Sequence, residues 1–117
     1  MNQAREPDSD ADSRRKELVD LFLRRTATEV EQMRRSVPAL IANDLTTWQE
    51  LRFYAQRIAG QSEGLALGVL GACARELAKL ADERFTRVAL DAEFLLAATS
   101  AIEMLAIELH ELSRPEA

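Results

Sequence analysis

The chain has 117 residues, of which 47% are hydrophobic, 30% charged and 5% aromatic, with four Gly, three Pro and one Cys. This composition predicts one folded domain and excludes global disorder, collagen-like repeats and a disulfide-rich scaffold. The net charge of −5 disfavours nucleic acid as a partner, because phosphate binding needs a basic surface. Every apolar run is too short to span a membrane, and residues 1–12 lack the pattern of a secretory signal. We therefore expect a cytoplasmic protein that binds another protein, and neither nucleic acid nor a membrane.

The first part of the chain divides into a polar tail and a helical segment. Residues 1–13 are polar and contain Pro7, which predicts a disordered tail followed by a folded domain over residues 14–117. Pro38 is expected to end or kink the helix before it, because proline lacks a backbone donor. The apolar residues after the tail recur at helical spacing and predict one or two helices, the first of them short: Leu18, Leu21, Phe22, Val30, Met33 and Val37.

The middle of the chain carries two further helical stripes. Asn43 and Asp44 predict a turn, and Thr46 with Gln49 resembles a capping box at the start of the next helix. Gly60 and Gly64 are expected to loosen the junction that follows. The apolar positions of the two stripes are Trp48, Leu51, Ala55 and Ile58, and then Leu67, Leu70, Ala74, Leu77 and Ala81.

The last stripe runs from Leu95 to Leu112, after a charged connection over Ala81–Val88 and a predicted helix cap at Asp91. Helices joined by short connections pack as antiparallel neighbours. The expected fold is therefore all-α: an antiparallel up-down four-helix bundle with a short additional N-terminal helix. The Leu95–Leu112 stripe could equally form a seam between two chains, although we expect a monomer rather than a dimer.

The residues offer few routes to catalysis, so we expect no enzyme activity and no cofactor or metal site. Walker, dinucleotide-binding and metalloprotease motifs are absent from the sequence. The single histidine, His110, is read as an exposed helical residue, and Cys73 as a small buried filler rather than a nucleophile.

One segment, WQELRFYAQRIAGQSEGLAL from Trp48 to Leu67, resembles the histidine-containing phosphotransfer (HPt) family of bacterial phosphorelays. The family pattern is an Ala, the phosphorylated His, a variable residue, Leu or Ile, Lys or Ala, and Gly. The residues that follow this pattern are Ala55, Arg57, Ile58, Ala59 and Gly60. The resemblance extends more weakly over about Leu18–Ala81, and it implies a four-helix bundle that meets a response-regulator receiver domain or a histidine kinase.

The sequence departs from the family at the residue that carries the chemistry. Gln56 stands where the family has the phosphorylated histidine. The lone pair of an amide nitrogen is delocalised into the carbonyl, so Gln56 can form hydrogen bonds but no phosphoramidate. The resemblance therefore implies the partner surface of an HPt module without its phosphoryl transfer.

Helical geometry places a candidate docking face around Gln56. Arg52, Ala59 and Gly60 lie at i−4, i+3 and i+4 of Gln56, which predicts one exposed face. Positive charge on that face would complement the acidic pocket of a receiver domain. The residues expected at the centre of the contact are Arg52, Gln56, Arg57, Ala59, Gly60 and Glu63.

Two other functions remain open on the sequence. The chain could be an active phosphotransfer protein, either through His110 or because a native histidine has been replaced at Gln56. It could also be a helical dimerisation module with no link to a phosphorelay, held together by the Leu95–Leu112 seam.

Overall fold

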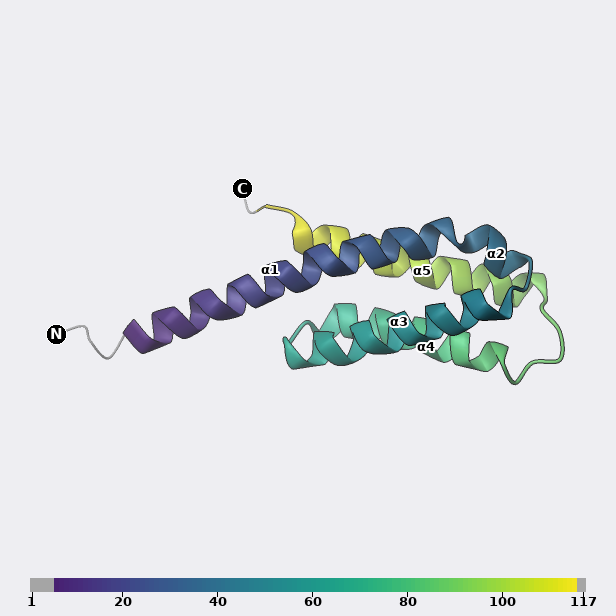
Figure 1. Ribbon diagram of the computed structural model, residues 1–117, viewed down its shortest axis with the longest axis horizontal. Coiled ribbons are helices and arrows are strands. Elements are labelled where there is room, and N and C mark those ends of the chain that lie inside the picture. Colours follow the sequence, from purple (N-terminus) through teal and green to yellow (C-terminus); the bar gives the residue numbers. More distant parts are fainter. Residues whose placement is uncertain (1–5, 116–117) are drawn as a thin grey trace.

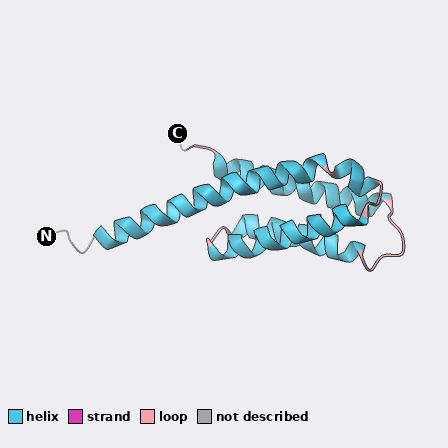
Figure 2. Ribbon diagram, in the orientation of Figure 1, coloured by secondary structure: helices cyan, strands magenta, loops and turns pink. Residues whose placement is uncertain are grey.

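The computed structural model describes residues 6–115, and the described part of the chain is helical with no strand. Five helices follow one another within these described residues (Figures 1 and 2). They are α1 (Glu6–Arg35), α2 (Val37–Ile41), α3 (Leu45–Gly64), α4 (Gly68–Arg84) and α5 (Ala92–Ser113). The predicted all-α class is thus confirmed.

The N-terminal region differs from the prediction. Helix α1 begins at Glu6, so residues 6–13 of the predicted disordered tail are helical, and residues 1–5 lie outside the described part. The first helix has 30 residues rather than being short; the short helix is α2, which follows it. The effect predicted for Pro38 is confirmed, because α1 ends at Arg35 and Pro38 lies in the first turn of α2.

The ends of the later helices show which capping signals operate. The carboxylate of Asp44 accepts from the backbone N–H of Thr46 at 3.0 Å and of Thr47, so Asp44 is the N-cap of α3 and the predicted Thr46 capping box is wrong. Asp91 caps α5 as predicted, accepting from Phe94 N–H at 2.7 Å. A carboxylate at either position also meets the positive end of the helix dipole.

The predicted stripes form the core. Trp48 is fully buried, donates from its indole Nε1 to the carbonyl of Leu40 at 3.1 Å, and stacks on Phe94 with ring centroids 5.7 Å apart. The Leu95–Leu112 stripe faces the inside of this same chain, which removes it as a seam between two chains. The other buried apolar residues of the stripes are Phe22, Val30, Met33, Leu51, Ala55, Ile58, Leu70, Ala74, Leu77, Ala81, Ala98, Ile102, Leu105 and Leu109.

The long helices lie in two layers, with α1 beside α5 and α3 beside α4 (Figure 1). Each long helix runs in the direction opposite to the next long one along the chain (Figure 1). Helix α4 contacts both α3 and α5, whereas α1 packs mainly on α5 and touches α3 much less. Helix α5 therefore lies diagonally opposite α3.

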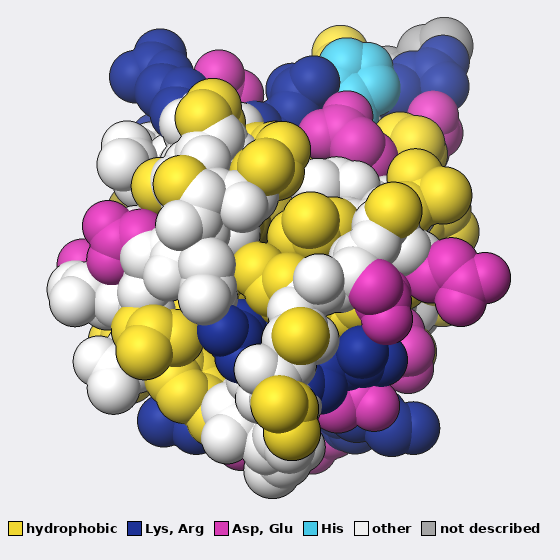
Figure 3. All heavy atoms as spheres, turned by 90° about the vertical axis from the view of Figure 1, so that its right-hand side faces the viewer, with side chains coloured by type: hydrophobic (Ala, Val, Ile, Leu, Met, Phe, Trp, Pro, Cys, Tyr) yellow, Lys and Arg dark blue, Asp and Glu magenta, His cyan; other side chains and the backbone are white. Residues whose placement is uncertain are grey.

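One end of the molecule, which we call the tied end, holds the α2–α3 turn over residues 42–44 and the α4–α5 loop over residues 85–91. The loop begins after Arg84, four residues later than the predicted start at Ala81. Arg84 is buried, and its guanidinium donates to the side-chain oxygen of Asn43, from Nε at 2.9 Å and also from Nη2. This contact joins the turn to the last residue of α4, directly before the loop. Seen end-on, apolar, basic and acidic side chains intermingle there (Figure 3).

The opposite end, the open end, holds the α3–α4 turn and a groove between α1 and α3. Leu18 and Leu21 were expected in the core but are 57% and 60% exposed, because the first half of α1 extends past α3 (Figure 1). The groove is lined by Leu18, Leu21, Phe22, Arg25, Gln61, Gly64 and Leu65.

Candidate functional site

Gln56 lies near the middle of α3 with its side chain exposed, as the sequence predicted. Its neighbours Ala55 and Ile58 are fully buried against the core, which fixes the rotation of the helix about its axis. An amide at this position can donate and accept hydrogen bonds towards a partner, and it offers no nucleophilic lone pair.

Gly60, one turn after Gln56, leaves an opening on the same face. A Cβ atom at Gly60 would meet no heavy atom within 4 Å, so the surface there is bare backbone of α3. The absence of a side chain lets another molecule approach this stretch of helix closely.

Ala59 does not lie on the exposed face, which corrects the sequence prediction. It is only 7% exposed and lies where α3 meets α4. A Cβ at Gly71 of α4 would lie 3.3 Å from Cβ of Ser62 and 3.6 Å from the carbonyl oxygen of Ala59. These small residues let α3 and α4 come close, so Ala59 supports the face from behind instead of contacting a partner.

The two predicted arginines turn towards different helices. Arg52 pairs with Asp82 of α4 at 3.2 Å, and its guanidinium lies 4.5 Å from the centroid of the Phe85 ring. Arg57 pairs with Glu29 of α1, with its guanidinium 5.1 Å from the centroid of the Tyr54 ring. Both positive charges are therefore compensated within the chain, and the expected patch of free arginine charge around Gln56 is wrong.

Glu63 is exposed and forms an ion pair with Arg75 of α4. Together with the Arg52–Asp82 pair, this contact sets the register of α3 against α4, which run in opposite directions. The register places Lys79 of α4 beside Gln56, and Lys79 is exposed without an ion-pair partner in the described range.

The candidate docking face is thus shared by two helices: α3 supplies Gln56, Gly60 and Glu63, and α4 supplies Arg75 and Lys79. Sequence reasoning missed the residues of α4 because it considered α3 alone. The antiparallel register of two helices joined by a short turn was the signal that could have found them.

The remaining chemical groups lie away from this face. His110 is an exposed residue in the last turn of α5, which is diagonally opposite α3. Partial burial and the nearby carboxylate of Glu108 raise the pKa of the Cys73 thiol, which disfavours the reactive thiolate. Among residues 6–115, no group of three His, Cys, Asp or Glu side chains is placed to hold a metal ion.

Comparisons with family models, with curated proteins and with solved structures found no match to this chain. Within the described range, no helix combines the length and the apolar character that crossing a lipid bilayer requires.

Proposed function

We propose that this chain is an HPt-like docking module of a bacterial phosphorelay that binds a receiver domain or a sensor kinase in the cytoplasm without accepting a phosphoryl group. The observation that carries the proposal is the exposed Gln56, which the motif Ala55–Gly60 aligns with the family's histidine, on a helix whose opposite side is buried. We further propose that the four long helices form an antiparallel four-helix bundle of that family's type.

The proposed loss of phosphoryl transfer follows from chemistry at one atom. Phosphorylation of a histidine needs a ring nitrogen with a free lone pair, and the Gln56 amide has none to offer. The module would therefore act by occupying a partner as an adaptor or competitor, and not as an enzyme.

The proposed contact is centred on Gln56 and Gly60, with Lys79 beside them. Gly60 leaves room for a partner's backbone, and Gln56 supplies a donor and an acceptor at the centre. Lys79, which forms no ion pair within residues 6–115, supplies a positive charge that suits the acidic pocket of a receiver domain. Arg52 and Arg57 stabilise the face through their own ion pairs.

The test is to introduce histidine at two positions of the same helix face. Gln49 is exposed and lies two turns before Gln56, so Gln49→His is the matched control for Gln56→His. We expect Gln56→His to take a labelled phosphoryl group from a phosphorylated receiver, and both Gln49→His and the wild type to remain unlabelled. Stable labelling of the wild type would overturn the loss of chemistry.

Binding is measured separately from transfer. Titration of the wild-type chain with receiver domains and kinase domains from the same cell should give a complex that Gly60→Arg weakens, because the new side chain fills the opening. A complete lack of binding in both titrations would overturn the docking role, whatever the outcome for Gln56→His.

A further inference from the structure

The groove at the open end has a mostly apolar wall and a single charged lining residue, Arg25. Its volume is about 440 Å³, which lies within the range of small-ligand sites. None of the described residues that line it carries a carboxylate. The wall leaves apolar surface in contact with water, and a ligand with an apolar part would cover it. Four side chains form this wall: Leu18, Leu21, Phe22 and Leu65.

The polar part of the groove is made by Arg25 of α1 and Gln61 of α3. Arg25 donates from Nη2 to Oε1 of Gln61 at 3.0 Å. This bond uses one of the five N–H donors of the guanidinium and orients the Gln61 amide, whose N–H₂ group remains a donor. Glu29, one turn further along α1, pairs with Arg57 and not with Arg25. Both groups can therefore donate to one carboxylate placed in the groove.

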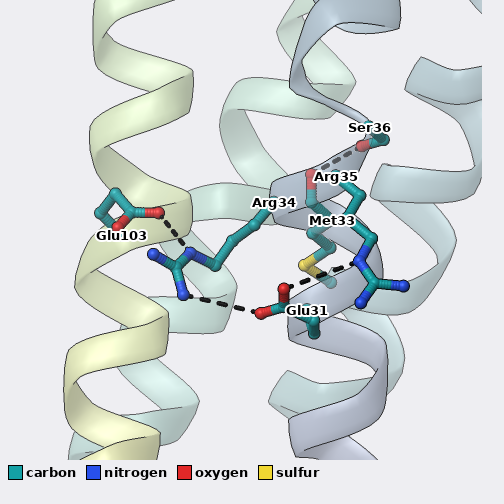
Figure 4. A network of polar contacts seen from close by, with 6 residues as sticks. All are labelled: Glu31, Met33, Arg34, Arg35, Ser36 and Glu103. Atoms are coloured by element: carbon teal, nitrogen blue, oxygen red, sulfur yellow. Dashed lines mark hydrogen bonds and ion pairs between the residues drawn. The ribbon is translucent and has the colours of Figure 1, made fainter.

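The arginines along α1 differ in how their charge is compensated. Near the end of the helix, Arg34 pairs with Glu31 and Glu103, and Arg35 also pairs with Glu31 (Figure 4). Arg25 forms no ion pair among residues 10–115, and its one side-chain partner is a neutral amide. The groove thus offers a positive charge that the carboxylate of a ligand can neutralise.

We propose that this groove binds an amphiphilic small molecule with one carboxylate and one alkyl chain, of the chemical class of medium-chain fatty acids. The carboxylate accepts from Arg25 and from the Gln61 amide, and the alkyl chain covers Leu18 and Leu21. Arg15, which donates to the carbonyl of Leu65, marks the far end of the groove. It lies ten residues before Arg25, so the helix offers roughly 15 Å of length to an extended chain.

The size and the charge of the groove favour this occupant over a larger one. One charged residue lines it, and the α3–α4 turn begins directly beyond it, after Gly64. A single head group and a single chain would fill both parts of the groove. The site rests on α1 and the end of α3, and it does not depend on the proposed phosphorelay role.

Titration of the full chain with sodium decanoate, below the concentration at which decanoate forms micelles, tests the site. We expect saturable shifts of the backbone amide resonances in nuclear magnetic resonance spectra, centred on residues 18–25 and 61–65. Decyltrimethylammonium has the same alkyl chain with a positive head group, and it should bind at least about tenfold more weakly because it cannot accept from Arg25.

Two substitutions test the polar part of the groove. Arg25→Met keeps the apolar stem and should raise the dissociation constant for decanoate at least about tenfold, because hydrogen bonds to a charged group are lost. Gln61→Glu should weaken decanoate similarly, since the chain then supplies its own carboxylate to Arg25. Arg24→Met is the matched control, because Arg24 is exposed and lines a different hollow, beside Leu112, and it should leave the affinity unchanged.

Four outcomes would overturn the proposal. They are a lack of saturable shifts up to about 5 mM decanoate, equal binding of the cationic analogue, equal weakening by Arg24→Met and Arg25→Met, and shifts centred on Leu96, Met104 and Ile107. The last result would mean that decanoate follows exposed apolar surface alone, since these three residues of α5 are also exposed. Thermal melts show whether each variant remains folded, and the two substitutions at the polar part change different helices.

Discussion

The two ends of this molecule are built in different ways. At the tied end, a buried tryptophan and a buried arginine both form hydrogen bonds: Trp48 donates to the carbonyl of Leu40 in α2, and Arg84 donates to the side chain of Asn43 in the α2–α3 turn. At the open end, Leu18 and Leu21 line a groove in place of a filled core. The difference shows that similar apolar stripes give a packed core only where helices lie on every side of the stripe.

The largest expected loss of stability comes from removing a core side chain at the tied end. Trp48→Ala removes the largest fully buried side chain and should lower the free energy of unfolding by about 3–5 kcal/mol. Leu21→Ala at the open end should change it by less than about 0.5 kcal/mol, because that side chain is mostly exposed. Denaturant unfolding of both variants measures the two free energies of unfolding. Equal losses would show that the two ends contribute equally to stability.

The next largest loss of stability is expected from removing the hydrogen bonds between Arg84 and Asn43 while the apolar core stays intact. Asn43 has a φ of 60°, so Asn43→Gly keeps the backbone of the turn and removes only the acceptor of Arg84. We expect a loss of about 1.5–3 kcal/mol, because a buried guanidinium loses its hydrogen bonds. Arg84→Met should then cost less in the Asn43→Gly background than in the wild type. Additive losses in this double-mutant cycle would mean that the two residues act independently.

Replacing two glycines near the open end by alanine should change the stability in opposite directions. Gly60→Ala should stabilise the chain by about 0.5–1 kcal/mol, since alanine favours the helix and its methyl group has free space. Gly71→Ala should be net destabilising, because its Cβ would press on Ser62 inside the tight α3–α4 contact. Thermal unfolding measures both, and a stabilised Gly71→Ala variant would show that α3 and α4 separate easily.

The smallest expected effect is a dependence of stability on pH, caused by the Asp91 cap at the tied end. The hydrogen bond from Phe94 N–H holds the pKa of Asp91 below its ordinary value of 3.8, and the charge of Arg87 adds to this. The capping contribution is therefore complete above the ordinary pKa and is lost as the pH falls through the lowered one. The Asp91→Asn variant should lose less stability than the wild type in thermal melts below about pH 4. Parallel losses would show that this carboxylate does not contribute.

The sequence predicted the elements whose stripe is covered by neighbouring helices. Ile58, Leu77 and Leu105 are all fully buried where helical spacing placed them. Leu18 follows the same spacing and is exposed, because periodicity identifies one face of a helix but not how far its neighbour extends. Tail composition misjudged residues 6–13, which continue α1 as a helix, although the side chains of residues 10–13 are exposed.

The candidate site was predictable in its centre but not at its edges. The exposure of Gln56 follows from the burial of Ala55 and Ile58 on the same helix. The ion pairs of Arg52 and Arg57 involve α4 and α1, so helical spacing within one segment could not reveal them. The burial of Ala59 likewise depends on Gly71, twelve positions further along the chain.

Ala66 in the α3–α4 turn has a φ of 59°, a left-handed conformation that disfavours any residue with a Cβ. Asn43 adopts the same conformation at the tied end, but its side chain gains hydrogen bonds there, whereas a methyl group gains none. The corner that brings Gly71 against Ser62 is therefore held under local torsional stress. The hydrogen bonds from Arg84 offset that cost at Asn43, whereas the α3–α4 turn is closed by backbone hydrogen bonds, among them the one from Leu67 N–H to the carbonyl of Ser62 at 2.8 Å.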